Sequence, residues 1–345
     1  MEIDIEDFDA LRRYLAERID SGEPASFQKL LGGVSNRTVR ITWPDGSGWV
    51  FKQALAKLRV QADWFSNPDR IQVEARALRW LNRIGVPGST PGFVFEDPEN
   101  HLIAMEAVPE AHENWKSVLL SGNIASDFFE QFGALLGTIH RQSADCPNSR
   151  QAFEDTTYFE SLRLEPYYLY TAQRVPEAAS FLYSLARETL QHKLSLVHGD
   201  FSPKNTLIYG GKLILLDFEA VHFGDPAFDV GFALTHFLSK AHHLREHRTV
   251  LRDAAKLFWQ TYSQQIALLQ WDSLELRAVR HTLGCLLARV AGKSPLEYLT
   301  LKEVGRQRDA VLRLMTERPA TIDHLIDEFV DRIEVHAENR QASRP

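Results

Sequence analysis

The N-terminal part of the chain begins with a helical hydrophobic pattern and then changes to a strand-like one. Apolar residues recur every three or four positions over residues 5–19, which predicts a short amphipathic helix. Short runs with alternating apolar positions follow, punctuated by turn residues such as those at 44–48. The predicted strands cover residues 27–31, 38–42, 49–52, 92–95 and 102–105. They predict an antiparallel sheet of five strands.

One helix with recognisable ends interrupts these strands. Asn67 suits an N-cap, Pro68 the first helical position, and Asp69 the positive end of the helix. The helical pattern ends near Ile84, before Gly85. The sequence therefore predicts a sheet with one long helix between its third and fourth strands.

Helical patterns dominate from about residue 107. The predicted helices cover residues 124–143, 175–192, 226–244, 247–268, 274–292 and 319–337. Two short strands, at 206–209 and 213–217, interrupt them. A sheet-rich part followed by a helical part indicates an α+β fold, with an N-terminal lobe over 1–106 and a helical lobe over 107–345.

Composition and charge narrow the class of protein. The chain has 345 residues, of which 44% are hydrophobic, and a formal net charge of -7. These values are ordinary for a globular protein, and the negative charge argues against a nucleic-acid partner. Two cysteines exclude a disulfide framework. The acidic N-terminus lacks the features of a signal peptide and no apolar run could span a membrane, so we expect a cytoplasmic protein without a membrane partner. The sequence does not indicate an oligomeric state.

The segments Leu196–Ile208 and Leu213–Glu219 carry the most specific chemistry. They place Asp200, Asn205 and Asp217 at the spacing that kinase-type phosphoryl transfer requires. Asp200 is the predicted catalytic residue, which accepts the proton of an attacking hydroxyl. Asn205 and Asp217 are predicted to supply oxygen ligands to Mg²⁺. A single aspartate in a loop is more often a turn residue, but the three together favour the functional interpretation.

The residues around this motif are assigned structural or ligand-binding roles. His198 is predicted to support the backbone of the catalytic loop rather than to act in catalysis. Lys204 is either a ligand of the γ-phosphate or a solvated loop lysine. Asp225 and Asp229 suit the start of a helix, and Asp229 is a candidate for a hydrogen bond back to the catalytic loop.

A lysine and a glutamate form a second candidate pair. Lys52 ends a predicted strand, a position from which it could neutralise the α- and β-phosphates. Glu74 lies on the apolar stripe of the helix, where an unpaired carboxylate would be costly, so we expect a Lys52–Glu74 ion pair. The arginines of this helix are assigned to its other faces. These are Arg70, Arg76, Arg79 and Arg83.

Backbone groups complete the predicted nucleotide site and make residues 1–106 the expected nucleotide-binding lobe. Gly32 and Gly33, followed by Ser35 and Asn36, could form a loop whose N–H groups approach phosphate oxygens, although two glycines are often only a turn. The segment from Glu106 to Val108 is predicted, from its position alone, to present backbone groups to adenine.

These residues together resemble the aminoglycoside phosphotransferase and choline kinase-like family. The resemblance extends from Phe27 to Gly231 and is most specific at His198–Asn205. Lys52–Leu55 with Arg59, Trp64, Arg70 and Glu74 is similar to the methylthioribose kinase branch, from which the ending Pro203-Lys204-Asn205 departs. The resemblance implies a bilobal protein-kinase-like fold, Mg²⁺ and ATP, with GTP not excluded, and phosphorylation of a small molecule's hydroxyl.

Departures from protein kinases favour a small-molecule substrate. Gly199 and Ser202 stand where protein kinases have arginine and lysine, and Glu219 follows the Asp217-Phe218 pair in place of glycine. A sugar, an amino alcohol and an aminoglycoside-like compound all remain candidate substrates. Residues 150–175 and the helices after 225 are expected to bind the substrate; aromatic residues at 158–170 could do so or could simply pack. The alternative function is an inactive, nucleotide-binding pseudokinase with a regulatory role, which usually lacks one of the key residues.

Overall fold

The computed structural model describes residues 3–18, 22–30, 33–60, 63–269 and 271–338. They form two compact units. The sheet unit comprises Met1–His112 and Tyr209–Val221, and the helical unit comprises Glu113–Ile208 and His222–Pro345. The predicted division between residues 106 and 107 stays a prediction.

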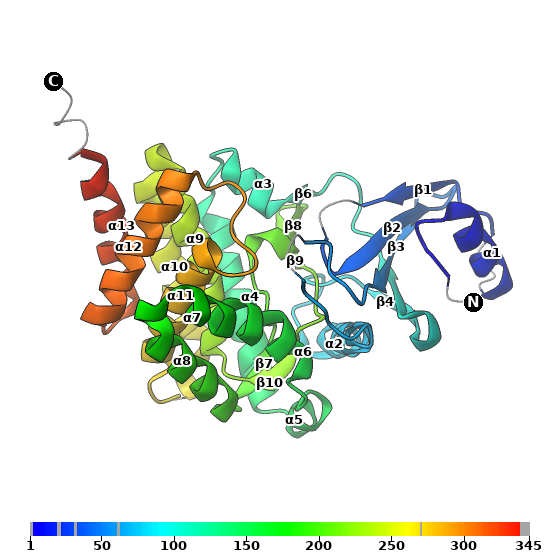
Figure 1. Ribbon diagram of the computed structural model, residues 1–345. Helices are drawn as coiled ribbons and strands as arrows, with labels where there is room; N and C mark the ends of the chain where they lie inside the picture. The colour runs from blue at the N-terminus through cyan, green and yellow to red at the C-terminus, as the bar shows by residue number, and fades with distance from the viewer. Residues whose placement is uncertain (1–2, 19–21, 31–32, 61–62, 270, 339–345) are drawn as a thin grey trace. The chain divides into compact units, whose positions relative to one another are not determined.

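The sheet unit contains the five-stranded antiparallel sheet that the sequence predicts (Figure 1). Its strands are β1 (Ser26–Lys29), β2 (Asn36–Thr42), β3 (Gly48–Ala54), β4 (Phe93–Asp97) and β5 (Leu102–Glu106), in the spatial order β1-β2-β3-β5-β4. A later segment of this unit contains β9 (Lys212–Leu215). The long central pairings of β3 with β2 and β5 fix the position of each side chain on β3.

Two helices cover opposite faces of this sheet. Phe51 of β3 packs in a core with Leu11 and Leu15 of α1 (Phe8–Arg18). Lys52, the next residue of β3, contacts Glu74 of α2 (Arg70–Ile84). Because successive side chains of a strand point to opposite faces, α1 and α2 lie on different sides of β3.

The start of α2 differs from the prediction. The helix begins at Arg70, with Asp69 in the N-cap position. The Asn67 side chain caps the preceding turn, where its Oδ1 accepts a hydrogen bond of 3.0 Å from Asp69 N. The predicted N-cap at Asn67 and first helical position at Pro68 are therefore wrong, because the Asn67 side chain caps the turn before the helix.

The helical unit surrounds helix α9 (Ala227–His243). Its other helical segments are α3 (Trp115–Leu120), α4 (Ser126–Ala144), α5 (Pro147–Ala152), α6 (Thr157–Phe159), the π-helical η2 (Glu160–Leu169), α7 (Tyr170–Arg174), η3 (Pro176–Ala178), α8 (Ala179–Gln191), η4 (Pro203–Asn205), η5 (Arg245–His247), α10 (Arg248–Ile266), η6 (Ala267–Leu269), α11 (Leu274–Ala291), α12 (Leu301–Glu317) and α13 (Ile322–Glu338). Its strands are β6 (Glu113–Asn114), β7 (Ser195–Val197), β8 (Thr206–Tyr209, whose last residue belongs to the sheet unit) and β10 (His222–Gly224).

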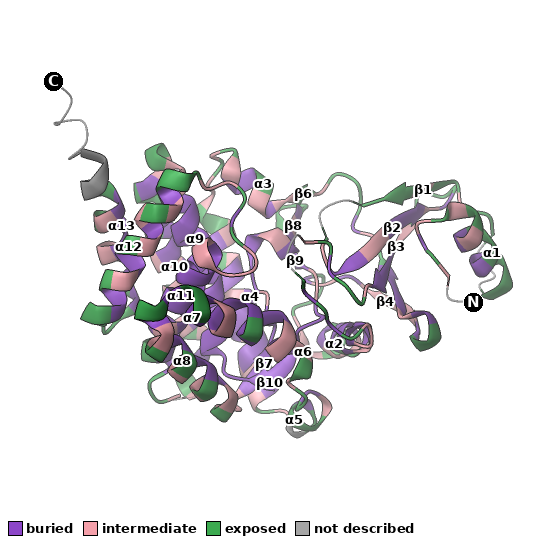
Figure 2. Ribbon diagram, in the orientation of Figure 1, coloured by how far each residue is buried: buried purple, intermediate pink, exposed green. Residues whose placement is uncertain are grey.

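Helix α9 is buried along nearly its whole length (Figure 2). Its sequence is apolar on all sides, which is typical of a helix enclosed by others. It packs against α10, α11, α12 and α13. Charged residues on such a helix have no access to water, so Asp229 and Lys240 need an explanation from their surroundings.

The sequence pattern does not predict several helical segments, among them α12 and the π-helical η2. Helix α12 begins with a capping box between Thr300 and Glu303, a signal that the sequence contains and that marks a helix start. The π-helical η2 contains Pro166, and its hydrogen bonds join residues five apart. Its hydrophobic positions therefore do not show the repeat of an α-helix.

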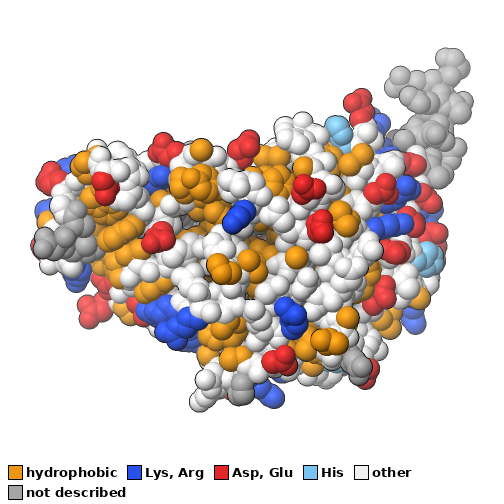
Figure 3. All heavy atoms as spheres, turned by 180° about the vertical axis from the view of Figure 1, so that it is seen from behind, with side chains coloured by type: hydrophobic (Ala, Val, Ile, Leu, Met, Phe, Trp, Pro, Cys, Tyr) orange, Lys and Arg blue, Asp and Glu red, His pale blue; other side chains and the backbone are white. Residues whose placement is uncertain are grey.

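Charged side chains of both signs lie on the surface, as the amino-acid composition predicts. Figure 3 shows acidic and basic side chains interspersed over the face that it presents, as expected for a formal net charge of -7. Among the helices of the described residues, none has the length and apolar character that crossing a bilayer requires.

The contact between α9 and α11 can be tested at Gly231. A Cβ atom there would lie 2.5 Å from His281 Cβ and 2.7 Å from Thr282 N, too close for α11 to accept without moving. Gly231→Ala should therefore lower the free energy of unfolding by about 1–3 kcal/mol, measured by urea denaturation. The matched control is Gly305→Ala in α12, where a Cβ meets nothing within 4 Å; it should raise stability by about 0.5–1 kcal/mol. Equal effects at both positions would contradict this packing.

Candidate functional site

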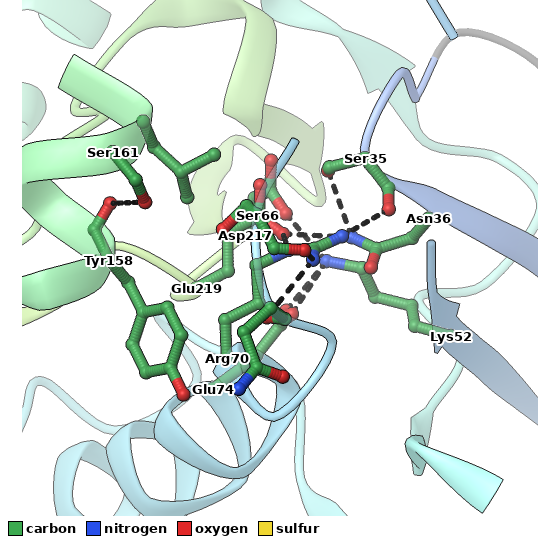
Figure 4. Close-up of polar contacts among 12 residues, drawn as sticks. Ser35, Asn36, Lys52, Ser66, Arg70, Glu74, Tyr158, Ser161, Asp217 and Glu219 are labelled. Carbon is green, nitrogen blue, oxygen red and sulfur yellow. Dashed lines mark hydrogen bonds and ion pairs between the residues drawn. The ribbon is translucent and has the colours of Figure 1, made fainter. Parts of the chain in front are cut away.

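Lys52 lies at the centre of a charged group in the sheet unit. Its Nζ is 2.7 Å from Glu74 Oε1, 2.9 Å from Glu74 Oε2 and 2.6 Å from Asp217 Oδ1. Figure 4 shows these contacts. The predicted Lys52–Glu74 ion pair is therefore present, and Asp217 joins it.

Burial makes these contacts strong. The Glu74 side chain is fully buried and that of Lys52 is 11% exposed. Burial raises the pKa of Glu74 to about 7, although the Lys52 charge opposes this shift. Burial alone would lower the pKa of Lys52, but the charges of Asp217 and Glu74 raise it above its ordinary value, so the ammonium persists at neutral pH.

Asp217 has an unusual backbone conformation. It follows β9, and its φ of 71° lies in the left-handed region that non-glycine residues rarely adopt. Such a conformation persists only where the surrounding structure fixes it, and it is frequent at functional sites. Its side chain remains 23% exposed while Oδ1 contacts Lys52.

A second buried ion pair lies beside this group. Arg70 Nε is 3.0 Å from Glu219 Oε2, and both side chains are at most 5% exposed. Arg70 also donates to the carbonyl oxygens of Ser35, Ser66 and Asn67. The assignment of Arg70 to a face of α2 away from Glu74 is wrong, because residues four apart lie on the same side of a helix.

This ion pair holds the predicted phosphate loop. Asn36 Nδ2 donates to Glu219 Oε2 at 3.2 Å and to Ser35 Oγ at 3.1 Å. Asn36 Oδ1 is buried and has no hydrogen-bond partner among the described residues. Gly33 is exposed, and Gly32 lies outside the described residues. The loop is thus anchored through Ser35 and Asn36 by side chains far away in sequence.

The segment predicted to bind adenine follows β5. Glu106 N donates to Gly92 O, and Val108 O accepts a hydrogen bond of 3.0 Å from Arg40 Nη1. The hydrogen bonds of the described residues give Val108 N no acceptor. Val108 N–H is therefore the backbone group that a base could use here.

Asp200 lies in a loop of the helical unit that several side chains hold in place. Its Oδ2 is 2.8 Å from Arg163 Nη2, and Arg163 Nε donates to Gly199 O at 2.5 Å. His198 Nδ1 accepts a hydrogen bond of 3.1 Å from Asp200 N, which confirms the predicted supporting contact of His198. No sequence motif predicts Arg163, because it lies in the π-helical η2, far from Asp200 in the sequence.

Asp229 of α9 holds the same loop from the other side. It accepts 2.6 and 2.9 Å hydrogen bonds from the backbone N–H groups of His198 and Gly199, as the sequence suggested. Burial alone would raise the pKa of Asp229, but its hydrogen bond to His140 and the neighbouring histidine charges hold it below its usual range. The buried charge of Asp229 is thus stabilised by the loop that it orders.

Asn205 and Lys204 lie in η4, directly after this loop. Asn205 Nδ2 donates to Asp200 O at 3.1 Å, while no donor among the described residues contacts Asn205 Oδ1. The carbonyl of Lys204 accepts a hydrogen bond of 2.8 Å from Asn114 Nδ2. The structure thus brings Asp200 and Asn205 together in one unit, and Lys52, Glu74 and Asp217 together in the other.

The donor types fit a hard divalent cation. Asn205 offers an amide oxygen and Asp217 a partly exposed carboxylate, which are the oxygen ligands that Mg²⁺ prefers. Within the described residues, no group of three or more histidine, cysteine, aspartate or glutamate side chains gathers as a metal site. Each residue is thus a candidate ligand in its own unit, Asn205 in the helical unit and Asp217 in the sheet unit.

Comparison with known proteins identifies the family. The model of the phosphotransferase enzyme family matches residues 26–267, more than half of the chain. The chain belongs to this family. The resemblance stated from the His198–Asn205 motif is thereby confirmed.

Individual relatives are more distant. A methylthioribose kinase of Citrobacter koseri is 25% identical over 67% of this chain and 66% of its own length. A methylthioribose kinase of Yersinia pseudotuberculosis is 26% identical over 55% of this chain. The chain spans about half to two thirds of the length of these curated relatives.

Solved structures share the fold. An amicoumacin kinase in complex with AMP-PNP, Ca²⁺ and Ami has a TM-score of 0.58 and 16% identity, over 92% of this chain and 95% of that one. A choline/ethanolamine kinase family protein of Mesorhizobium loti has a TM-score of 0.52 and 15% identity, over 95% and 99%. These likenesses show the protein-kinase-like fold that was predicted.

The buried Arg70–Glu219 pair gives a test of the sheet unit. Arg70→Met leaves Glu219 buried without its cation, so the free energy of unfolding should fall by about 3–5 kcal/mol, measured by urea denaturation. Adding Glu219→Gln should recover part of this loss, because the uncompensated charge is removed. The control Arg83→Met changes an exposed residue of the same helix and should shift stability by less than about 0.5 kcal/mol. A loss at Arg70 no larger than at Arg83 would contradict the network.

Proposed function

We propose that this protein transfers the γ-phosphoryl group of ATP to a hydroxyl of a small molecule. The observation that carries the proposal is the position of Lys52 between the buried Glu74 and Asp217. Kinase-type sites use such a lysine–glutamate pair to clamp nucleotide phosphates, together with a metal-binding aspartate. Family membership and relatives named as kinases support the same reaction class.

Each residue of the proposal has a definite task. Lys52 neutralises the α- and β-phosphates, and Val108 N–H binds the base. Loop residues 33–36 cover the phosphates, and Lys204 contacts the γ-phosphate. Asn205 and Asp217 would hold Mg²⁺, which neutralises charge on the phosphate oxygens when bound.

Asp200 orients the substrate hydroxyl and takes its proton. The substrate oxygen forms a bond to the γ-phosphorus while the bond from that phosphorus to the oxygen of the departing ADP breaks. Arg163, at 2.8 Å from Asp200 Oδ2, fixes the direction of the carboxylate. Such catalysis consists mainly of positioning and charge stabilisation, which a loop held by these contacts suits.

Replacement of Asp200 tests the assigned base. Asp200→Ala should lower kcat by about two to four powers of ten, in an assay that couples ADP release to substrate addition. Nucleotide affinity, measured by calorimetry, should stay near that of the wild type, because Asp200 acts on the other substrate. Asp309→Ala, at an exposed position of α12, is the matched control and should retain full activity. Substantial activity in Asp200→Ala would remove this residue from the mechanism.

Replacement of Lys52 tests the phosphate clamp. Lys52→Met should raise the KM for ATP by about tenfold or more and lower kcat, because charge-assisted contacts to the phosphates are lost. The double variant with Glu74→Gln should show the same kinetics without a buried unpaired carboxylate, which separates binding from stability. Lys57→Met, at an exposed lysine of the same segment, should behave as wild type. Unchanged kinetics in Lys52→Met would refute the clamp.

A further inference from the structure

A group of cationic side chains is buried in the helical unit without enough negative charge. Lys240 of α9 is fully buried, and its Nζ contacts a backbone oxygen, that of His236, at 3.3 Å. The ring centre of Tyr298 lies 5.6 Å away. Among the described residues, no carboxylate lies within ion-pair distance of Lys240. An ammonium in such a place is costly unless an anion joins it.

Arg289 of α11 is the second member of this group. Its side chain is almost fully buried, and Nη1 donates to Ser294 O at 2.8 Å and to Ser294 Oγ at 3.0 Å. Nη2 lies 3.2 Å from His236 Nε2, and the buried Nε has no hydrogen-bond partner in the described part of the chain. This guanidinium also makes no ion pair with a described carboxylate.

The charges of this group act on one another. Burial, with the charges of Arg289 and Lys240, holds the pKa of His236 well below its usual range, so its neutral ring can accept from Arg289. Burial lowers the pKa of Lys240 to about 7, assisted by Lys116 and Arg289 and opposed by Glu297. Glu297 forms an ion pair with Lys116, but its side chain is 67% exposed. The net environment of Lys240 remains positive.

Two aromatic rings connect this group to the candidate catalytic aspartate. The guanidinium carbon of Arg289 lies 5.4 Å from the ring centre of Tyr167 and 5.7 Å from that of Phe232. The guanidinium carbon of Arg163 lies 6.0 and 5.9 Å from the same two rings. Arg163 also contacts Asp200. A series of side-chain contacts therefore connects the cationic group to the catalytic loop.

We infer that Lys240, Arg289 and Lys116 bind the anionic part of the substrate, and that the substrate is therefore an alcohol bearing a carboxylate or phosphate. The inference rests on the proposed function, because it assigns the substrate of that same site. The buried hydroxyl of Tyr298, which has no partner among the described residues, supplies a further donor. A cationic substrate such as an amino alcohol or an aminoglycoside would meet repulsion here.

Access requires a movement of the segment between α11 and α12. Residues 293–300 of this segment cover Lys240 and Arg289 through Tyr298 and Ser294. The exposed Lys116–Glu297 ion pair, which restrains the segment, is of a kind that contributes little stability. The incoming anion takes the place of the Glu297 carboxylate on Lys116.

Binding of matched small alcohols tests the inference without catalysis. Glycerate and glycerol phosphate carry an anion, glycerol is neutral, and aminopropanediol is cationic; their binding to the full chain is measured by calorimetry. At least one of the two anionic compounds should bind more tightly, by about tenfold or more, than glycerol and aminopropanediol do. A preference for the neutral or the cationic compound, or no binding of either anion, would overturn the inference.

Substitutions in the cationic group test whether the anion binds there. Lys240→Met and Arg289→Met should each weaken binding of the anion by about tenfold or more, with glycerol unaffected. Glu297→Gln should strengthen it, because a competing carboxylate is removed. Lys256→Met in α10, where the lysine is partly exposed and pairs with Asp327, is the control and should change nothing. Anion affinity that survives Lys240→Met and Arg289→Met would contradict the assignment.

Proton uptake gives a test on the wild-type protein, which does not depend on the folding of a variant. A bound anion raises the pKa of Lys240. Binding of glycerate, whose carboxylate stays ionised at both pH values, should therefore take up part of a proton at about pH 8, and almost none at about pH 6, where Lys240 is already charged. Calorimetry in buffers of different ionisation enthalpy measures this uptake. Equal uptake at both pH values would count against Lys240.

The same compounds separate this inference from the proposed function. ADP formation with glycerol or aminopropanediol, but not with the anions, would leave a phosphotransferase and overturn the anionic substrate. Anion binding that depends on Lys240 and Arg289, with no ADP formed from any compound at saturating Mg-ATP, would leave the anion site and count against phosphoryl transfer to these alcohols.

Discussion

The sheet unit depends on the charge of one buried lysine. Lys52 is nearly enclosed, and its ammonium is tolerated because Glu74 and Asp217 both lie within 3 Å of it. This requirement ties β3 to α2 and to Asp217, whose backbone after β9 lies in the left-handed region. The Arg70–Glu219 pair repeats the arrangement and anchors the loop that contains Ser35 and Asn36. The contacts that compensate for the burial of these charges therefore also position the residues proposed to bind the nucleotide.

Two buried charges of the helical unit lie in different surroundings, and the described residues compensate one of them and not the other. Asp229 is buried at the centre of α9, and the backbone N–H groups that neutralise it belong to the catalytic loop. Lys240, further along the same helix, has no such compensation within the described residues. The hydrogen bonds to Asp229 compensate for its burial within the protein. The charge of Lys240 is not compensated by any described carboxylate, so an anionic ligand would stabilise it. This contrast separates a structural buried charge from a candidate binding residue.

The sequence predicted those features that depend on local spacing. Strand alternation and helical periodicity located the five-stranded sheet and most long helices, and the stripe containing Glu74 predicted its contact with Lys52. Arg70 was misplaced because a charged residue on an amphipathic helix is usually exposed, and its partner Glu219 is far away in sequence. Arg163, Lys240 and Arg289 were not selected, since their environment arises only when η2, α9 and α11 pack together. Their sequence neighbours carry no motif, so only the tertiary structure reveals the group.

Phosphoryl transfer to a small alcohol can be tested by direct analysis of the reaction products. The protein is incubated with Mg-ATP and pooled small alcohols of negative, neutral and positive charge, and the mixture is followed by phosphorus NMR. Equal amounts of ADP and a new phosphate monoester are expected. ATP that binds but yields no ester from any pool, or ADP accompanied only by inorganic phosphate, would contradict phosphoryl transfer to an alcohol.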